Sequence, residues 1–322
     1  MNVSLKSLQR QAAQGGFRVE VLEKVCRLRQ ILTGFGRHPF LKSRLVLKGG
    51  TALNLFLFDL PRLSVDIDLN YVGQADREAM LAERPYVEQA VQDVCARESM
   101  QVARLPEEHA GGKWRLRYAS VFGQQGSLEV DINYLQRILL WPVQRHDAAR
   151  LAGIQARSVP LLDIHELAAG KLAALFARRA SRDLFDAHQL LHQPGLDDQR
   201  LRTAFLVYGG MNRKDWRTIR VEDIGFDPTE LQNQLVPTLR RQEIGKIGRT
   251  NAWAAQLIDE CRTALARILP FTELEKRFLD TLLDDGELAP ELLTRDNELV
   301  ERIAQHPGLL WKRHNVRRHR GT

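Results

Sequence analysis

Lys48-Gly49-Gly50-Thr51 and Val65-Asp66-Ile67-Asp68-Leu69-Asn70-Tyr71-Val72 are the two stretches that decide the expected fold of this chain. Acidic and aliphatic residues alternate in the second stretch. This period of two predicts a strand whose carboxylates share one face while its aliphatic side chains enter a core. The first stretch follows a short apolar run, Leu45–Leu47, and precedes an expected helix over residues 52–58. A strand, a glycine turn, a helix and a second strand predict an α/β fold at the N-terminus.

The rest of the chain extends this pattern in two parts. Before residue 160, apolar periodicity predicts a helix over 17–33 that ends near Gly34 and another over 76–98 that Pro85 kinks or divides. After Pro160 the pattern is helical. With 322 residues the chain is long enough for two domains. Three further strands are expected at residues 101–105, 113–121 and 128–134.

Composition excludes several classes of protein. The chain is 44% hydrophobic and 27% charged, as in ordinary globular proteins. No apolar run approaches the length of a membrane helix, the N-terminus does not resemble a signal peptide, and three separated cysteines argue against a disulfide framework. A soluble, cytoplasmic protein without a membrane partner is therefore expected.

The formal net charge of +7 is concentrated at the C-terminus. Residues 311–322 hold five Lys and Arg residues and no acid, and without them the formal net charge is +2. A basic tail of this kind binds nucleic acid by releasing counterions, or it is simply a solvated terminus.

The paired carboxylates of Asp66 and Asp68 predict a metal site. Two carboxylates about 5 Å apart repel by roughly 3 kcal/mol at an effective dielectric constant near 20, and a divalent cation relieves that repulsion. Mg²⁺ commonly binds a few carboxylates together with substrate phosphates. Asp131, in the similar run Val130-Asp131-Ile132, is either a third ligand of a two-metal site or an acid on an edge strand.

The glycine turn offers a place for phosphates. Gly49 and Gly50 let the backbone approach a phosphate closely, and Thr51 adds a hydroxyl donor. An ordinary strand-to-helix turn is the simpler explanation, since Lys48 precedes the glycines instead of following them as in a Walker A loop.

These motifs resemble those of AbiEii/AbiGii-type nucleotidyltransferases, the toxins of abortive-infection toxin–antitoxin pairs. That family is related to the MenT toxins and, more distantly, to DNA polymerase β. The first signature is Lys48–Leu53 with Arg62–Asp68, and the second is Lys171 with Arg182-Asp183-Leu184-Phe185-Asp186. Together they span residues 48–190, and the residues matched to functional positions are Ser64, Asp66, Asp68, Lys171 and Asp183.

The resemblance implies an Mg²⁺-dependent enzyme that moves a nucleoside monophosphate from an NTP to RNA. The acceptor is expected to be the 3′ end of tRNA. Modification of that end would block translation and so act as a phage defence. A cognate antitoxin is the expected second partner. The expected architecture is a mixed-sheet catalytic domain at 1–160, a helical domain at 161–310 that closes the active-site cleft, and a basic tail at 311–322.

Individual roles follow from the residue types. Asp66, Asp68 and Asp131 are expected to bind metal, and Gly49, Gly50, Thr51, Ser64 and Arg182 to bind the nucleotide. Lys171 neutralises the triphosphate as a point charge. Ser64 is alternatively a site where a partner modifies the enzyme, or a polar residue at the start of the strand. Asp183 and Asp186 orient the nearby cations or touch the nucleotide, unless Arg182 and Asp186 form an i,i+4 surface pair.

Other features point to no chemistry. Arg178 and Arg179 are expected on a solvated helix face. His188 and His192 are four residues apart but lack a third ligand in the sequence, so they are expected to be surface residues. Two alternatives remain for the whole protein: a non-catalytic module that binds nucleic acid or antitoxin, and an enzyme of the same fold that transfers AMP to protein.

Overall fold

The computed structural model describes residues 4–105, 110–151, 155–246 and 250–320. The chain folds into two compact units. The first unit comprises Met1–Arg137, Val143–Leu162 and Val236–Ile247, and the second comprises Ile138–Pro142, Asp163–Leu235 and Gly248–Thr322. The chain thus leaves the first unit near residue 162 and returns to it for a short segment that includes helix α9 (Arg241–Lys246).

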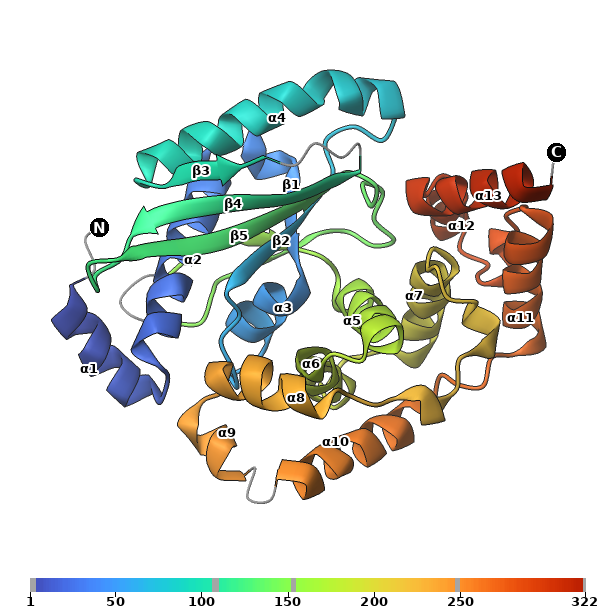
Figure 1. Ribbon diagram of the computed structural model, residues 1–322. Helices are drawn as coiled ribbons and strands as arrows, with labels where there is room; N and C mark the ends of the chain where they lie inside the picture. Colours follow the sequence, from blue (N-terminus) through green and yellow to red (C-terminus); the bar gives the residue numbers. More distant parts are fainter. Residues whose placement is uncertain (1–3, 106–109, 152–154, 247–249, 321–322) are drawn as a thin grey trace. The chain divides into compact units, whose positions relative to one another are not determined.

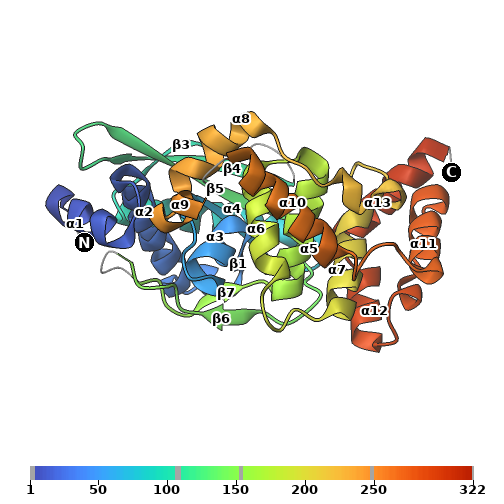
Figure 2. The ribbon, with the colours of Figure 1, turned by 90° about the horizontal axis from the view of Figure 1, so that it is seen from below.

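The first unit is built on a seven-stranded sheet of order β3-β4-β5-β2-β1-β7-β6 (Figure 1). Most neighbouring strands are antiparallel, but β2 pairs with β5, and β1 with β7, in parallel, so the sheet is mixed as expected. Seen from below, β6 and β7 continue the sheet beyond β1 (Figure 2). The strands are β1 (Leu45–Lys48), β2 (Asp66–Tyr71), β3 (Gln101–Arg104), β4 (Gly111–Ala119), β5 (Gln125–Asn133), β6 (Gln144–His146) and β7 (Val159–Leu161).

Apolar side chains cover one face of this sheet. Ile67 and Leu69 of β2 stand beside Val130 and Ile132 of β5, and all four are buried. Trp114 of β4 continues the same layer. The alternation that predicted β2 therefore holds, since the intervening aspartates stay partly exposed. The helices of this unit are α1 (Leu5–Gly15), α2 (Val19–Arg37), α3 (Gly49–Ala52), α4 (Arg77–Arg97) and α9, and a π-turn over Leu53–Leu57 continues α3.

Two helix boundaries differ from the expectation. Helix α2 continues through Gly34, whose lack of a side chain lets Val94 of α4 pack directly against it. Gly34 therefore permits a close helix contact and does not end the helix. Pro85 lies inside α4, which continues on both sides of it. Of the two expected effects of Pro85, a kink or a division, the division is therefore wrong.

The second unit is helical. Helices α5 and α7 pack together, and α6 lies against α5 and α10. A cluster of aromatic rings, Phe176, Phe205 and Trp216, fills its core with centroid separations of 5.0–5.8 Å. The helices are α5 (Ile164–Arg178), α6 (Ser181–Leu191), α7 (Asp198–Gly210), α8 (Pro228–Glu230), α10 (Thr250–Leu265), α11 (Glu273–Asp280), α12 (Asn297–Ala304) and α13 (Pro307–Arg320).

Within the described part of the chain, no helix has both the length and the apolar character that a membrane span requires.

The basic C-terminal segment forms part of α13. Leu309 is fully buried, Lys312 Nζ donates to the Asn212 carbonyl at 2.8 Å, and Arg317 Nε donates to the Gly286 carbonyl at 2.8 Å. Arg320 pairs with Asp285 at 3.2 Å. Several of these cations are thus bound to their own unit.

Candidate active site

The aspartates of the first unit converge through the parallel pairing of β2 with β5. Asp68 is in register with Asp131, and Asp66 with Glu129. Paired positions on neighbouring strands lie about 4.8 Å apart and point to the same face. Asp66, Asp68 and Asp131 therefore form one carboxylate group on the face opposite the apolar layer. Because β5 lies between β4 and β2, the edge-strand interpretation of Asp131 is wrong.

Two lysines flank this group in the same row of the sheet. Lys48 of β1 is in register with Asp68, and Lys113 of β4 with Asp131. The row across four adjacent strands therefore reads cation, anion, anion, cation. Desolvation lowers the pKa of Lys48, and the charges of Asp68 and Asp131 oppose that shift.

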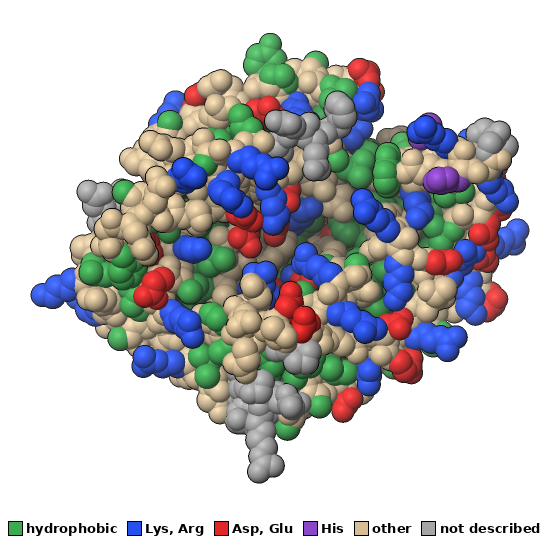
Figure 3. Space-filling model, in the orientation of Figure 1, with side chains coloured by type: hydrophobic (Ala, Val, Ile, Leu, Met, Phe, Trp, Pro, Cys, Tyr) green, Lys and Arg blue, Asp and Glu red, His purple; other side chains and the backbone are tan. Residues whose placement is uncertain are grey.

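Glu129 extends the carboxylate group toward the basic side chains of β4. It forms ion pairs with Lys113 at 3.0 Å and Arg115 at 3.5 Å. Figure 3 shows basic and acidic side chains side by side where Figure 1 places β4 and β5. The hydrogen bond to Glu129 raises the pKa of Lys113. Sequence reasoning missed Lys48, Lys113 and Glu129, because only the strand register places them in the same rows as the aspartates.

The glycine turn is shaped by Asp68. Gly49 has φ = 70°, a conformation that disfavours residues with a side chain, and the Asp68 carboxylate occupies the space that a Cβ atom would need. Gly50 is buried, and its carbonyl accepts a hydrogen bond from Asn54 Nδ2 at 2.9 Å. The turn therefore packs directly against the carboxylate group.

Thr51 ties this turn to β2. Its side chain is fully buried, and its hydroxyl donates to the backbone carbonyl of Asp66. This hydrogen bond fixes the first residue of the strand relative to the turn.

Ser64 lies two residues before Asp66 but outside the strand, which begins at Asp66. The argument that both side chains share one strand face therefore does not apply to Ser64. Only 8% of Ser64 is exposed. The preceding residues are held by Thr238 and Leu239, through the hydrogen bond from the Leu63 amide to the Thr238 carbonyl and the β-bridge of Arg62 with Leu239.

In the second unit, Lys171 on α5 lies in a buried charge network. Its ammonium group is 2.9 Å from Asp183 and 3.1 Å from Asp186, both on α6. Asp183 and Asp186 are 1% and 0% exposed. The charges of Lys171 and Arg178 outweigh desolvation and hold the pKa of Asp183 well below its usual range. This network keeps the Asp183 carboxylate ionised beside a fixed lysine.

Arg178 and Arg179 are exposed as expected, but Arg178 also takes part in an ion pair. Arg178 binds both oxygens of Asp183, at 2.5 Å and 3.1 Å, although 64% of its side chain is exposed. It is therefore part of the network, not merely a solvated side chain. Asp186 pairs with Lys171, so the sequence-based alternative of an Arg182–Asp186 surface pair is not needed to explain Asp186. Arg182 is half-buried on α6.

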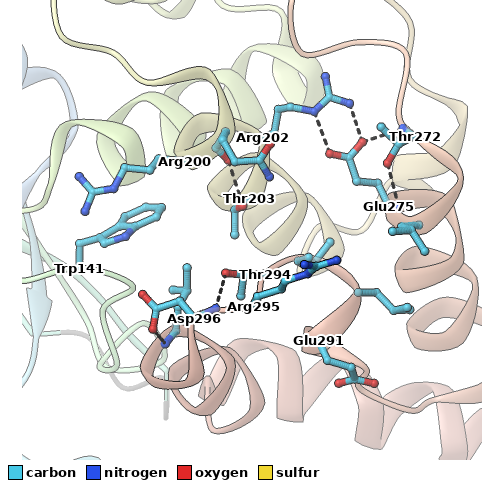
Figure 4. A pocket seen from close by; sticks show the side chains of 15 residues that line it. Trp141, Arg200, Arg202, Thr203, Thr272, Glu275, Glu291, Thr294, Arg295 and Asp296 are labelled. Carbon is cyan, nitrogen blue, oxygen red and sulfur yellow. Dashed lines mark hydrogen bonds and ion pairs between the residues drawn. The ribbon is translucent and has the colours of Figure 1, made fainter.

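The second unit also contains a pocket of about 540 Å³ (Figure 4). On its wall Arg202 forms a two-pronged ion pair with Glu275, and Arg200 stacks over the ring of Trp141 at 4.9 Å. The residues that line the pocket include none of the predicted site residues. We assign no chemistry to it.

Comparison with known proteins decides the family. Residues 30–283 match the sequence profile of the family described as "Nucleotidyl transferase AbiEii toxin, Type IV TA system". The chain belongs to the AbiEii family. The match includes both signatures and most of both units, so this AbiEii chain is a nucleotidyltransferase toxin of a type IV toxin–antitoxin system. The family implies a nucleotide substrate and an antitoxin partner.

A solved structure supports the fold of this AbiEii chain. MenT4, a nucleotidyltransferase toxin from Mycobacterium tuberculosis H37Rv, matches with a TM-score of 0.56 and 18% sequence identity. The match covers 94% of this chain and 99% of MenT4. No curated protein matches the sequence significantly. The mixed sheet followed by helices is therefore the fold of this group of toxins.

Proposed function

We propose that this AbiEii toxin transfers a nucleoside monophosphate from an NTP to RNA with Mg²⁺ as cofactor, and that its acceptor is the 3′ end of tRNA. Such a modification would block translation. The observation that carries the proposal is the register of Asp68 with Asp131, which places three carboxylates on one face beside the glycine turn. The family match supports the reaction class, while the metal, the acceptor and the individual residue roles are proposed here.

The carboxylate group fits a hard divalent cation. Asp66, Asp68 and Asp131 supply oxygen ligands, and their mutual repulsion favours a bound cation. When bound, Mg²⁺ would polarise the phosphate oxygens and neutralise charge that develops on them. Lys48 and Lys113 offset part of the negative charge of the row, which lowers its repulsion of a polyphosphate.

The reaction then needs few side chains. The acceptor hydroxyl oxygen forms a bond to the α-phosphorus of the NTP, the bond from that phosphorus to the β-phosphate oxygen breaks, and pyrophosphate leaves. In this scheme Asp131 accepts the proton of the attacking hydroxyl. Catalysis is mainly positioning and charge stabilisation.

The phosphates are assigned to the backbone of the glycine turn and to Lys171. Gly49 and Gly50 allow the main chain to approach a phosphate, and Thr51 contributes by holding the turn against Asp66. Lys171 serves as the cation for the triphosphate, and Asp183 is the positioning residue that fixes it. Ser64 and Arg182 complete the proposed nucleotide contacts by their match to the family signatures.

A polyanionic acceptor suits the basic side chains of β4. Lys113, Arg115 and Arg117 are exposed on the face that carries Asp131. Such side chains attract any RNA and do not by themselves select tRNA.

The test is incubation of the purified toxin with labelled NTPs, Mg²⁺ and total RNA. Wild type should label RNA, and Asp68→Asn and Lys171→Ala should each reduce labelling more than about 100-fold, as removal of essential electrostatic groups does. Glu78→Gln is the control, because it makes a carboxylate-to-amide change at an exposed side chain of α4. It should keep most of the activity.

Four outcomes would contradict the proposal. Absence of label transfer by the wild type, or undiminished transfer by Asp68→Asn, would exclude the proposed chemistry. Label that migrates with protein would instead indicate an AMP-transferase of the same fold. Salt-sensitive RNA binding that Asp66→Ala leaves unchanged, without label transfer, would indicate a non-catalytic module. Sequencing of RNA 3′ ends after expression identifies the acceptor and the nucleotide.

A further inference from the structure

Two histidines and a glutamate meet on the surface of the second unit. His188 and His192 lie one turn apart at the C-terminal end of α6, and Glu260 comes from α10, which packs against α6. One ligand atom from each of the three lies within 4.8 Å of the others. The sequence suggested two surface histidines without a third ligand. Helix α10 supplies that ligand from about 70 positions away, a proximity that only folding creates.

Hydrogen bonds orient these side chains in the manner of metal ligands. His192 Nδ1 lies 2.7 Å from the carbonyl of His188. A carbonyl only accepts, so Nδ1 carries the proton and Nε2 keeps its lone pair. Such a bond from the second ring nitrogen to a backbone carbonyl is typical of metal-binding histidines. Glu260 is oriented similarly, because its Oε1 accepts from Gln256 Nε2 at 2.7 Å.

We propose that His188, His192 and Glu260 form a binding site for Zn²⁺ that is separate from the aspartates of the sheet. Two imidazoles and one carboxylate are a common ligand set for Zn²⁺, with water as the fourth ligand. His192 is exposed, so the ion can reach the site from solvent.

Binding replaces an existing hydrogen bond. His188 Nε2 donates to Glu260 Oε2 at 2.5 Å. A tetrahedral ion about 2.0–2.1 Å from each ligand atom needs a wider separation, so the two side chains move slightly apart. The His188 proton shifts from Nε2 to Nδ1, which lies 3.5 Å from Gln189 Nε2. Rotation of the Gln189 amide then turns its oxygen toward Nδ1 as the acceptor. The carboxylate and the Nε2 lone pair then both face the ion, with no proton lost from neutral His188.

The ion would join α6 to α10. Helix α6 also carries Asp183 and Asp186, which hold Lys171. A Zn²⁺ ion at the far end of this helix would therefore stabilise the element on which the lysine network depends.

The experiment uses full-length protein without a histidine tag, first freed of metal with a chelator. Zn²⁺ is then titrated by calorimetry, and Co²⁺ is added separately to record its visible absorption. Wild type should bind one Zn²⁺ at this site, show a rise in Tm and give the d–d bands of tetrahedral Co²⁺. His192→Ala and Glu260→Gln should each weaken Zn²⁺ binding by more than about 100-fold, beyond the loss typical of a changed ligand-orienting residue. Both should abolish the Co²⁺ bands.

Two controls make the result specific. His319→Ala removes an exposed histidine of α13 and should leave Zn²⁺ binding unchanged. An Asp66→Asn/Asp68→Asn variant should also retain this Zn²⁺ site, because its aspartates belong to the other unit. The proposal is overturned if wild type binds no Zn²⁺, or if His192→Ala binds Zn²⁺ as tightly as wild type. Loss of the site in the Asp66→Asn/Asp68→Asn variant would also overturn it.

Discussion

Asp68 and Asp131 occupy directly paired positions on the parallel strands β2 and β5, although 63 positions separate them in the chain. Neither residue has an aliphatic neighbour on its own face of the sheet at this position, because the adjacent strands contribute Lys48 and Lys113. The row therefore holds two anions between two cations. This arrangement leads to a prediction about metal dependence.

Asp131→Asn should raise the Mg²⁺ concentration needed for half-maximal label transfer by at least about tenfold, since it removes one charged ligand from the group. Maximal transfer should also fall, because the proposed proton acceptor is lost. The measurement is transfer rate against Mg²⁺ concentration. If the variant differs in neither quantity, Asp131 is outside the metal site.

Gly49→Ala should damage both stability and activity. The positive φ alone costs about 1–2 kcal/mol for a residue with a Cβ atom, and the new methyl group must also displace the Asp68 carboxylate. Gly123→Ala is the matched control, since Gly123 also has a positive φ but open space where its Cβ would lie. Urea unfolding should show a lower free energy of unfolding in both variants, because both place a Cβ atom at a positive φ. Only Gly49→Ala should lose label transfer.

Substitutions of Thr51 test whether its hydroxyl supports the structure or contacts the substrate. Thr51→Val removes the donor to the Asp66 carbonyl and should lower the free energy of unfolding by about 1–3 kcal/mol, because a part-buried carbonyl loses this hydrogen bond. Thr51→Ser keeps the hydroxyl and should keep most of the activity. An increase in KM for the NTP in Thr51→Val without any loss of stability would contradict this structural role.

Asp183→Asn should be strongly destabilising. It removes one of the two carboxylates that pair with Lys171 and leaves Asp186 in place, so the loss should approach the roughly 3–5 kcal/mol of breaking a buried ion pair from one side. Arg178→Ala removes the exposed member of the same network and should cost about 1 kcal/mol or less. Equal losses of unfolding free energy in the two variants would show that the network is not organised around Lys171.

The low pKa of Asp183 also makes stability depend on pH. The contribution of Asp183 to the free energy of unfolding is lost as the pH falls below the usual range of an aspartate.

Glu166 gives the protein a pH dependence of the opposite sign. It is buried, accepts hydrogen bonds from the Trp141 amide and the Tyr208 hydroxyl, both at 3.2 Å, and desolvation raises its pKa from 4.5 to about 7. The folded state therefore binds this proton more tightly than the unfolded chain. The contribution of Glu166 to the free energy of unfolding is at its maximum below pH 4.5, the unfolded-state pKa. This contribution decreases as the pH rises to about 7.

Glu166→Gln should remove this dependence of the unfolding free energy on pH. Above pH 7 the variant should be more stable than wild type, by at most about 3 kcal/mol for a shift of this size, and the difference should vanish near pH 4.5. Urea unfolding at pH 5 and pH 8 measures it. Glu273→Gln makes the same change at an exposed side chain and should leave the pH dependence unaltered. A variant that is less stable than wild type at pH 8 would contradict the assignment.

The local pattern of the sequence was sufficient for β2. Alternation from Asp66 to Leu69 placed two carboxylates on one face, because successive side chains of any strand point to opposite sides. It was also sufficient for β1, β3, β4 and β5, with boundaries shifted by a few residues. The three-residue strands β6 and β7 were not predicted, since so short a segment has no measurable period.

Relationships between distant segments came only from the tertiary structure. Glu166 accepts hydrogen bonds from Trp141 and Tyr208, which no local pattern of the sequence indicates. Likewise, the pairing of Asp68 with Asp131 and the approach of Glu260 to His188 depend on strand register and helix packing. The sequence alone determined which residues carry charge and which face of each element is apolar, because those properties depend on residue type and period. Which charges meet was decided by folding, because the energies that set register and packing are summed over the whole core.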